Sequence, residues 1–273
     1  MSNPPLCNST IMIDPNAHVH PTARIGSDVR IGPFSVVGPH VSLGQGVVLH
    51  SHACVRGTTD VGAYTEIHLF AVVGGPAQTV PADRGPARLT LGTHNTIREH
   101  VTIHGGTGDG ETRIGDHNTF MVGAHVAHDC VLGNHIVAAN ETGISGHCQV
   151  GDFVFFGGKS ACHQYVRVGE SAMLGGNCHA FEDVLPFTLV KYSPARTTRV
   201  NSTGLSRRGF SAAQIATIDH AVSRILDGGG DLERLVVALL AEESSEHVMQ
   251  LARFVAESRR GIAPRPLPAG GRS

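Results

Sequence analysis

The residues best suited to chemistry lie in one segment, 120–149. Among the residues of this segment are His125, His128, Asp129 and His147. Neutral imidazole near pH 7 can take a proton from a hydroxyl group, and a neighbouring carboxylate can fix its tautomer and orientation. These residue types predict general-base chemistry, provided that the fold brings His147 back beside the other three.

A six-residue repeat predicts how the chain positions these side chains. An aliphatic or other apolar residue recurs every six positions over 13–73, again over 91–103, and again over 114–180. Such self-similarity indicates a parallel β-helix, in which each repeat buries its apolar side only by stacking on its neighbours. A period of six suits neither an amphipathic helix nor a simple alternating strand. The sequence therefore predicts an all-β fold with three faces and about eighteen residues per coil.

A coil of eighteen residues stacks each residue beside the one eighteen positions later. His128 should then lie beside Gly146, and Gly146 beside Gln164. Strand neighbours in a sheet lie about 4.7–4.9 Å apart, and a glycine lets its backbone N–H approach a developing oxyanion closely. The outward patch predicted in this way holds His128, Asp129, Gly146, His147, His163 and Gln164.

The histidines could instead be solvated surface residues or metal ligands. The chain has 18 histidines, so a solitary one such as His40, His52 or His117 is expected to be a solvated surface residue. Imidazoles from neighbouring coils or subunits could also bind zinc, as three histidines and a water do in some hydrolytic sites. Residue types alone do not separate a general base from a metal ligand.

Composition excludes some classes of protein. A net charge of −2 over 273 residues argues against a general nucleic-acid binder. The six cysteines show no CxxC spacing, so small buried thiols and a reducing, cytoplasmic compartment are expected. The first residues resemble no signal peptide, and no apolar run approaches the ~20 residues of a membrane span. We therefore expect a cytoplasmic protein that is not an integral membrane protein.

The chain divides into four predicted parts. Residues 1–12 are expected to form a flexible tail, 13–190 the β-helix, 191–262 a small α-helical C-terminal domain and 263–273 a disordered tail. Two interruptions of the repeat, at about 75–88 and 104–113, are rich in proline or glycine and are expected to be loops, where binding residues are common.

Three helices are expected in the C-terminal domain. Ser211 and Gln214 have the spacing of a capping box at the start of the first helix. Gly228, Gly229 and Gly230 should end that helix, and Asp231 could cap the second. Apolar stripes along all three helices would bury against one another and against the last coil.

Several motifs together resemble the UDP-N-acetylglucosamine O-acyltransferases of lipid A biosynthesis. They are the runs NTIREHVTIHGGT and AHVAHDCVLGNHIVAAN, the pairs Gly146-His147 and His163-Gln164, and GLSRRGFS at 204–211. The match runs from about residue 13 to about residue 261. Hexads alone are shared with many acyltransferases and with γ-class carbonic anhydrases, whereas AHxAHDC followed by GH, HQ and RRGFS is much more specific.

The resemblance implies a left-handed β-helix that forms a homotrimer, an exception to the usual right-handed crossover. Active sites would lie in clefts between subunits. The enzyme would move a 3-hydroxyacyl chain from the phosphopantetheine of acyl carrier protein to the 3-hydroxyl of UDP-N-acetylglucosamine. Attack would come directly from the sugar hydroxyl, so the resemblance implies no metal and no cofactor.

The same resemblance assigns roles to matched residues. His128 would be the general base with Asp129 beside it, and the Gly146 N–H would stabilise the oxyanion. The other matched positions would bind substrate: His125, His147, His163 and Gln164 in the cleft, Gln78 in the first loop, Gly176 near the end of the acyl chain, and Asn201, Arg207 and Arg208 at the nucleotide and carrier-protein end.

Some positions differ from the family pattern where substrates are held. Thr79 and Pro81 replace an aspartate and a lysine, Gly105 replaces an arginine, and 191–195 replaces a Gly-Asn/Asp-x-Ala motif. The acceptor could therefore be plain UDP-N-acetylglucosamine or a modified UDP-sugar such as a 3-amino sugar. Two further classes stay open from the residues: a zinc enzyme like the γ-class carbonic anhydrases, and a non-catalytic trimer that binds a sugar nucleotide.

Overall fold

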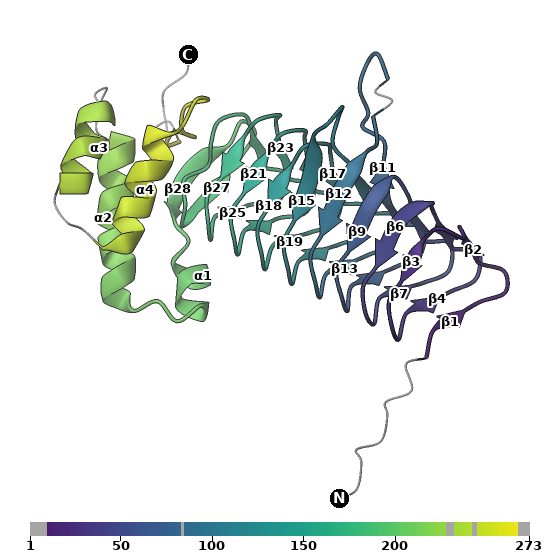
Figure 1. The fold of residues 1–273 in the computed structure, drawn as a ribbon. Helices are drawn as coiled ribbons and strands as arrows, with labels where there is room; N and C mark the ends of the chain where they lie inside the picture. The colour runs from purple at the N-terminus through teal and green to yellow at the C-terminus, as the bar shows by residue number, and fades with distance from the viewer. Residues whose placement is uncertain (1–9, 83–84, 228–231, 242–244, 267–273) are drawn as a thin grey trace, which may run out of the picture.

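The structure is a computed structural model that describes residues 10–82, 85–227, 232–241 and 245–266. It is a left-handed parallel β-helix, a three-sided prism of short stacked strands with a small helical region at one end (Figure 1). The fold class predicted from the hexads is therefore confirmed. No helix within the described ranges is long and apolar enough to cross a membrane.

Three sheets form the sides of the prism. The eleven-stranded sheet contains, in spatial order, β1 (Met12–Ile13), β4 (Arg30–Ile31), β7 (Val48–Leu49), β10 (Glu66–Ile67), β13 (Thr96–Ile97), β16 (Thr119–Phe120), β19 (Val137–Ala138), β22 (Phe155–Phe156), β25 (Met173–Leu174), β27 (Thr188–Lys191) and β28 (Arg196–Val200). The nine-stranded sheet contains β2 (His18–Val19), β5 (Val36–Val37), β8 (Cys54–Val55), β11 (Val72–Gly75), β14 (Thr102–His104), β17 (His125–Val126), β20 (Gly143–Ile144), β23 (Ala161–Cys162) and β26 (His179–Ala180). The eight-stranded sheet contains β24 (Arg167–Val168), β21 (Gln149–Val150), β18 (Val131–Leu132), β15 (Glu111–Ile114), β12 (Arg88–Leu91), β9 (Thr58–Val61), β6 (His40–Leu43) and β3 (Arg24–Ile25).

The stacking register is the one that the repeat predicts. His125 of β17 pairs with Gly143 of β20, eighteen residues later. Two loops lengthen the spacing elsewhere. Glu66 pairs with Thr96, thirty positions later, because the chain leaves the coil between β11 and β12. Thr102 pairs with His125, twenty-three positions later, because a second loop separates β14 from β15.

The repeat also explains the core and the corners. The apolar residue that ends each short strand points inward, so Leu49, Ile67 and Phe156 are at most 1% exposed. The chain turns between strands through residues in the left-handed region, among them Asp129 at φ 59° and His147 at φ 61°. Aspartate and histidine are enriched in that region. Side chains at these corners consequently project away from the core.

The prism ends in an antiparallel pair and four helices. β27 and β28 pair antiparallel, so the predicted boundary at 190/191 falls inside a hairpin rather than before a helical domain. The helices are α1 (Ser202–Arg207), α2 (Ala212–Asp227), α3 (Leu232–Ala241) and α4 (Glu246–Ala256). The short α1 was not predicted. Their apolar faces bury a second core with Leu185 and Phe187 at the end of the prism.

The predicted start of the first long helix is met, but both predicted tails are too long: β1 already begins at Met12, and Ala263 is buried with its carbonyl accepting from Thr197 Oγ1. The capping box is present, since Ser211 N–H donates to Gln214 and Gln214 N–H donates to Ser211 Oγ. The glycines 228–230, the cap at Asp231, residues 1–9 and residues 267–273 lie outside the described residues. Cys130, Cys148, Cys162 and Cys178 are free buried thiols, as expected.

Candidate active site

His128 and Asp129 form a buried pair at the corner that follows β17. The His128 Nδ1 lies 2.8 Å from Asp129 Oδ2, and each side chain is only 10% exposed. An ionised carboxylate can only accept hydrogen bonds, so Nδ1 carries the hydrogen and Nε2 carries the lone pair. This arrangement leaves a proton-accepting nitrogen directed away from Asp129.

The loop between β14 and β15 fixes the Asp129 carboxylate. Thr107 N–H donates to both carboxylate oxygens at 3.1 and 3.2 Å, and the Thr107 hydroxyl donates to Oδ2 at 2.8 Å. Burial on its own would raise the pKa of Asp129. Hydrogen bonds from His128 and Thr107 and the nearby His147 outweigh burial and lower this pKa. Asp129 is therefore held as an anion in a fixed orientation.

Gly146 lies on the next coil, against the face of the His128 ring. A Cβ atom at residue 146 would fall 2.7 Å from Cε1 and 2.8 Å from Nε2 of His128. Glycine is therefore the residue that lets the ring stand there. Within the described part of the chain, the Gly146 N–H makes no backbone hydrogen bond, whereas its carbonyl accepts from Tyr165 N–H. An unpaired backbone N–H at a glycine next to the His128 ring can stabilise negative charge that develops on a substrate oxygen.

His147 completes this group from the same corner as Gly146. Its Nε2 lies 3.8 Å from Asp129 Oδ2, and its ring meets the His128 ring edge-on at 5.1 Å. The other face of the His147 ring stacks on Tyr165 at 4.5 Å. The structure thus brings together His128, Asp129, Gly146 and His147.

Two further histidines line the opposite side of the pair. His125 Nδ1 lies 2.7 Å from Thr102 Oγ1, and the His104 ring meets the His125 ring edge-on at 4.9 Å. Burial lowers the pKa of His104 to about 4, helped by repulsion from His125 and His128. Burial, and then His128, also lower the pKa of His125. Both imidazoles are consequently neutral near pH 7.

His163 and Gln164 lie one coil further along and are exposed. Tyr165 N–H donates to Gly146 O at 3.1 Å, so the predicted stacking of this coil on Gly146 holds. The His163 Nδ1, however, lies 3.4 Å from the guanidinium of Arg260, near the C-terminal end of the described chain. Arg260 was not identified from the sequence, because no repeat relates it to residue 163.

Asn201, Arg207 and Arg208 line a different groove, of about 690 Å³, beside α1 and the eleven-stranded sheet. Asn201 caps α1 by accepting from Gly204 N–H and donates to Ser171 O. The Arg208 guanidinium stacks 3.6 Å over the Phe153 ring and contacts Ser171 and Glu170. Two of the three predicted residues therefore also hold the fold together at this end.

The remaining predicted residues are solvent-exposed. Gln78 lies in the loop after β11, and Gly176 lies in the corner after β25. A Cβ atom at Gly176 would meet only Gly158 O, at an ordinary 3.5 Å. The packing of the coil therefore does not require a glycine at 176. The effect of this glycine is to leave space on the outer side of the coil.

Three residues of the site, Thr102, His104 and Thr107, were not predicted from the sequence. All three contact the predicted residues across coils that a loop has lengthened, so the eighteen-residue rule does not find them. If the residues of the loop are left out of the count, Thr102 and His125 become predicted neighbours on successive coils.

Comparisons with known proteins place this arrangement in a family. Residues 183–263 match the family model described as UDP N-acetylglucosamine O-acyltransferase, domain 2, and residues 11–39 match the bacterial transferase hexapeptide model. The structure is similar to LpxA from Acinetobacter baumannii, with 36% identity, 92% of this chain and 99% of that chain covered and a TM-score of 0.89. It is also similar to the UDP-N-acetylglucosamine acyltransferase from Campylobacter jejuni, with 34% identity, 93% and 100% coverage and a TM-score of 0.86.

A third similar structure is LpxA from Bacteroides fragilis, a UDP-N-acetylglucosamine acyltransferase with 31% identity, 92% and 99% coverage and a TM-score of 0.88. These identities extend over both the β-helix and the helical end. The chain belongs to the UDP-N-acetylglucosamine O-acyltransferase family of hexapeptide-repeat acyltransferases.

Proposed function

We propose that this acyltransferase moves a 3-hydroxyacyl chain from acyl carrier protein to the 3-hydroxyl of UDP-N-acetylglucosamine, the first step of lipid A biosynthesis. The observation that carries the proposal is the His128 ring, which Asp129 holds at Nδ1 and which packs against Gly146 on the side of Cε1 and Nε2. This geometry supplies a proton acceptor next to a glycine whose N–H can serve as an oxyanion donor.

The reaction follows from these groups. His128 Nε2 takes the proton of the sugar hydroxyl while the hydroxyl oxygen attacks the thioester carbonyl carbon. The carbonyl oxygen becomes an oxyanion that the Gly146 N–H stabilises. The carbon–sulfur bond then breaks, and the leaving thiolate of phosphopantetheine takes the proton back from His128. Asp129, anchored by Thr107, orients the ring and stabilises the imidazolium that forms between the two steps.

The same residues could be considered as metal ligands, because ligand atoms of His128, Asp129 and His147 all lie within 4.8 Å of one another. The hydrogen bonds favour the general base instead. Asp129 already accepts from Thr107 N–H, the Thr107 hydroxyl and His128 Nδ1, which occupies most of its acceptor positions. The family comparisons likewise favour acyl transfer over a zinc enzyme or a non-catalytic trimer.

The charge of one groove fits acyl carrier protein as the donor of the acyl chain. Acyl carrier protein is acidic, and the groove beside α1 is lined by Lys191, Arg199, Arg207 and Arg208. A cationic surface would steer an acidic carrier despite the near-neutral net charge of the chain. We expect a homotrimer acting in the cytoplasm, with no cofactor apart from the phosphopantetheine carried by the donor.

The loop that would hold the acceptor differs from the family pattern. Thr79 and Pro81 lie in the loop after β11, at the positions where the family pattern has an aspartate and a lysine. His125, His147 and Gln78 are expected to take over contacts to the sugar nucleotide. A 3-amino UDP-sugar is therefore included as a second acceptor in the test.

The test is acyl transfer from 3-hydroxyacyl carrier proteins of several chain lengths, read by mass spectrometry. His128→Ala should lower kcat by ~10²–10⁴, the usual worth of a general base. His117→Ala, at an exposed corner of the neighbouring coil, serves as the matched control. Transfer that survives in His128→Ala at the wild-type rate would refute the assignment of the base. Product with the 3-amino acceptor alone would refute plain UDP-N-acetylglucosamine as the substrate.

A further inference from the structure

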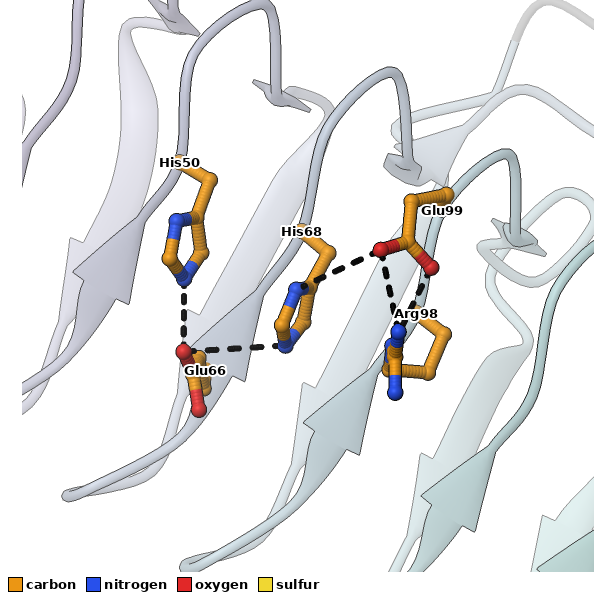
Figure 2. A network of polar contacts seen from close by, with 5 residues as sticks. All are labelled: His50, Glu66, His68, Arg98 and Glu99. Carbon is orange, nitrogen blue, oxygen red and sulfur yellow. Dashed lines mark hydrogen bonds and ion pairs between the residues drawn. The ribbon is translucent and has the colours of Figure 1, made fainter.

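A second histidine cluster lies on the outer face of the eleven-stranded sheet, on coils nearer the N-terminus. His50 follows β7, Glu66 begins β10, and His68 follows β10 (Figure 2). Their ligand-type atoms all lie within 4.8 Å of one another. Among the described residues, only this trio and the His128 group meet that criterion. The acyl-transfer chemistry proposed above uses none of the three.

The geometry of the trio is convergent. The Nε2 of His50 lies 2.6 Å from Glu66 Oε1, and the Nε2 of His68 lies 3.6 Å from the same oxygen. The two rings are stacked, with centroids 4.5 Å apart and an angle of 17° between their planes. Eighteen-residue stacking thus aims two imidazole nitrogens at one carboxylate oxygen.

A carboxylate also faces the far side of the His68 ring. The Nδ1 of His68 lies 3.8 Å from Glu99 Oε1, and Arg98 holds Glu99 through two hydrogen bonds of 3.1 Å (Figure 2). Histidines that bind metals commonly present the other ring nitrogen to a carboxylate in this way. The His68 side chain is 17% exposed, so the ring is largely fixed between the two carboxylates.

The hydrogen count at His68 favours the binding of a cation. A neutral imidazole carries one N–H, yet both ring nitrogens of His68 face an anionic oxygen. Whichever nitrogen bears the hydrogen, the lone pair of the other one faces a carboxylate. Arg98 is already paired with Glu99, and no arginine or lysine in the described ranges forms an ion pair with Glu66, which lies between two imidazoles. A divalent cation bound by Nε2 of His50, Nε2 of His68 and Glu66 satisfies all of these groups.

We propose that His50, Glu66 and His68 bind a divalent transition-metal ion. Two imidazoles and one carboxylate form a ligand set that suits zinc, with a fourth position left for water. Glu66 and His50 are 44% and 36% exposed, so an ion can reach the site from solvent. Such an ion would join the coil of β7 to the coil of β10. Through Glu99 it would also be linked to the coil of β13, beyond the point where the long loop interrupts the repeat. Its role would be to hold these coils in register.

The test uses the full chain without a histidine tag, freed of metal by a chelator and then titrated with Co²⁺ and Zn²⁺. Cobalt absorption bands and calorimetry should both report one ion per chain at this cluster. His50→Ala, His68→Ala and the isosteric Glu66→Gln should each weaken binding at least ~10-fold, and Glu99→Gln should weaken it by ~10–100-fold, the usual effect of losing an outer-shell partner. Circular dichroism checks that each variant is folded.

Two controls separate this cluster from other histidines. His52→Ala, two residues from His50 but with its ring packed between those of Phe34 and Phe70, should bind with wild-type affinity. His147→Ala removes a member of the His128 group and should leave the ion of the His50 cluster in place. The proposal is overturned if the wild type binds neither metal, if the variants of His50, Glu66 and His68 bind like the wild type, or if His147→Ala is the variant that abolishes binding. None of these readouts depends on acyl transfer.

Discussion

The histidines around Asp129 differ in what their ring nitrogens face. His128 meets the carboxylate at 2.8 Å, His147 lies 3.8 Å from it, and His104 has a buried Nδ1 without a hydrogen-bond partner among the described residues. Only His128 therefore combines a fixed tautomer with a free Nε2. The buried nitrogen of His104 makes protonation there unfavourable, so this residue keeps the surroundings of His128 neutral.

His104 makes stability depend on pH. Its pKa is about 4 in the folded chain, below the ordinary 6.5, because of burial first and then His125 and His128. Below pH 6.5 the unfolded chain takes up a proton that the folded chain does not, so stability falls as pH falls toward 4. By pH 5 the loss reaches about 2 kcal/mol. We expect His104→Gln to reduce the drop in Tm between pH 7.5 and pH 5.

The control for this prediction is His52→Gln. His52 is exposed at a corner of another coil, and its ring packs between two phenylalanines. It should leave the pH dependence of Tm unchanged. An equal drop in Tm for the wild type and His104→Gln would show that other groups dominate the acid response.

At the scale of elements, the two loops that leave the coil contact each other, and the shorter one also contacts the active-site corner. Figure 1 shows the longer loop, between β11 and β12, projecting from the prism near β11. Gly105, at the start of the shorter loop, donates its N–H to Gly75 O, where the longer loop begins, and lies directly under Ala87, where it ends. Both ends of the longer loop therefore contact Gly105.

That contact gives a prediction for the loop. A Cβ atom at residue 105 would lie 2.3 Å from the carbonyl carbon and oxygen of Ala87. Gly105→Ala should therefore displace the loop end and cost about 1–3 kcal/mol, as overpacking does. Hydrogen exchange of 76–87 should become faster. Gly176→Ala, whose Cβ would make an ordinary 3.5 Å contact, is the matched control and should change neither quantity. Unaltered exchange in Gly105→Ala would mean that the loop is held elsewhere.

The elements also determine what the sequence could and could not predict. Buried positions and the neighbours Gly146 and His147 followed from the six-residue repeat, because each coil repeats the same backbone geometry. Contacts that cross a loop did not follow, and Thr107 with Asp129 is an example. The hairpin of β27 and β28 was missed for the same reason, since its register is antiparallel and outside the repeat. Periodicity predicts local stacking but carries no information about segments that leave the coil.

At the scale of the whole molecule, the two groups of predicted residues lie on different sides of the prism. His128 follows β17, at the corner between the nine-stranded and eight-stranded sheets. Arg208 lies over Phe153, at the corner between the eight-stranded and eleven-stranded sheets. The packed core of the coil fills the space between these corners. We therefore expect one substrate to touch both groups where two chains of the proposed trimer bring these corners together.

A cleft shared between two chains predicts complementation between inactive variants. His128→Ala and Arg208→Gln chains should each be inactive or strongly impaired alone, although both should assemble with a mass three times that of the 28.7 kDa chain. Co-expressed in equal amounts, they should recover activity, because about a quarter of the interfaces in a cyclic trimer then pair an intact His128 with an intact Arg208. Separately purified and mixed trimers that do not exchange subunits are the control. Recovery is measured as acyl transfer per chain. A co-expressed sample no more active than the mixed trimers would place both groups in one chain and contradict a shared cleft.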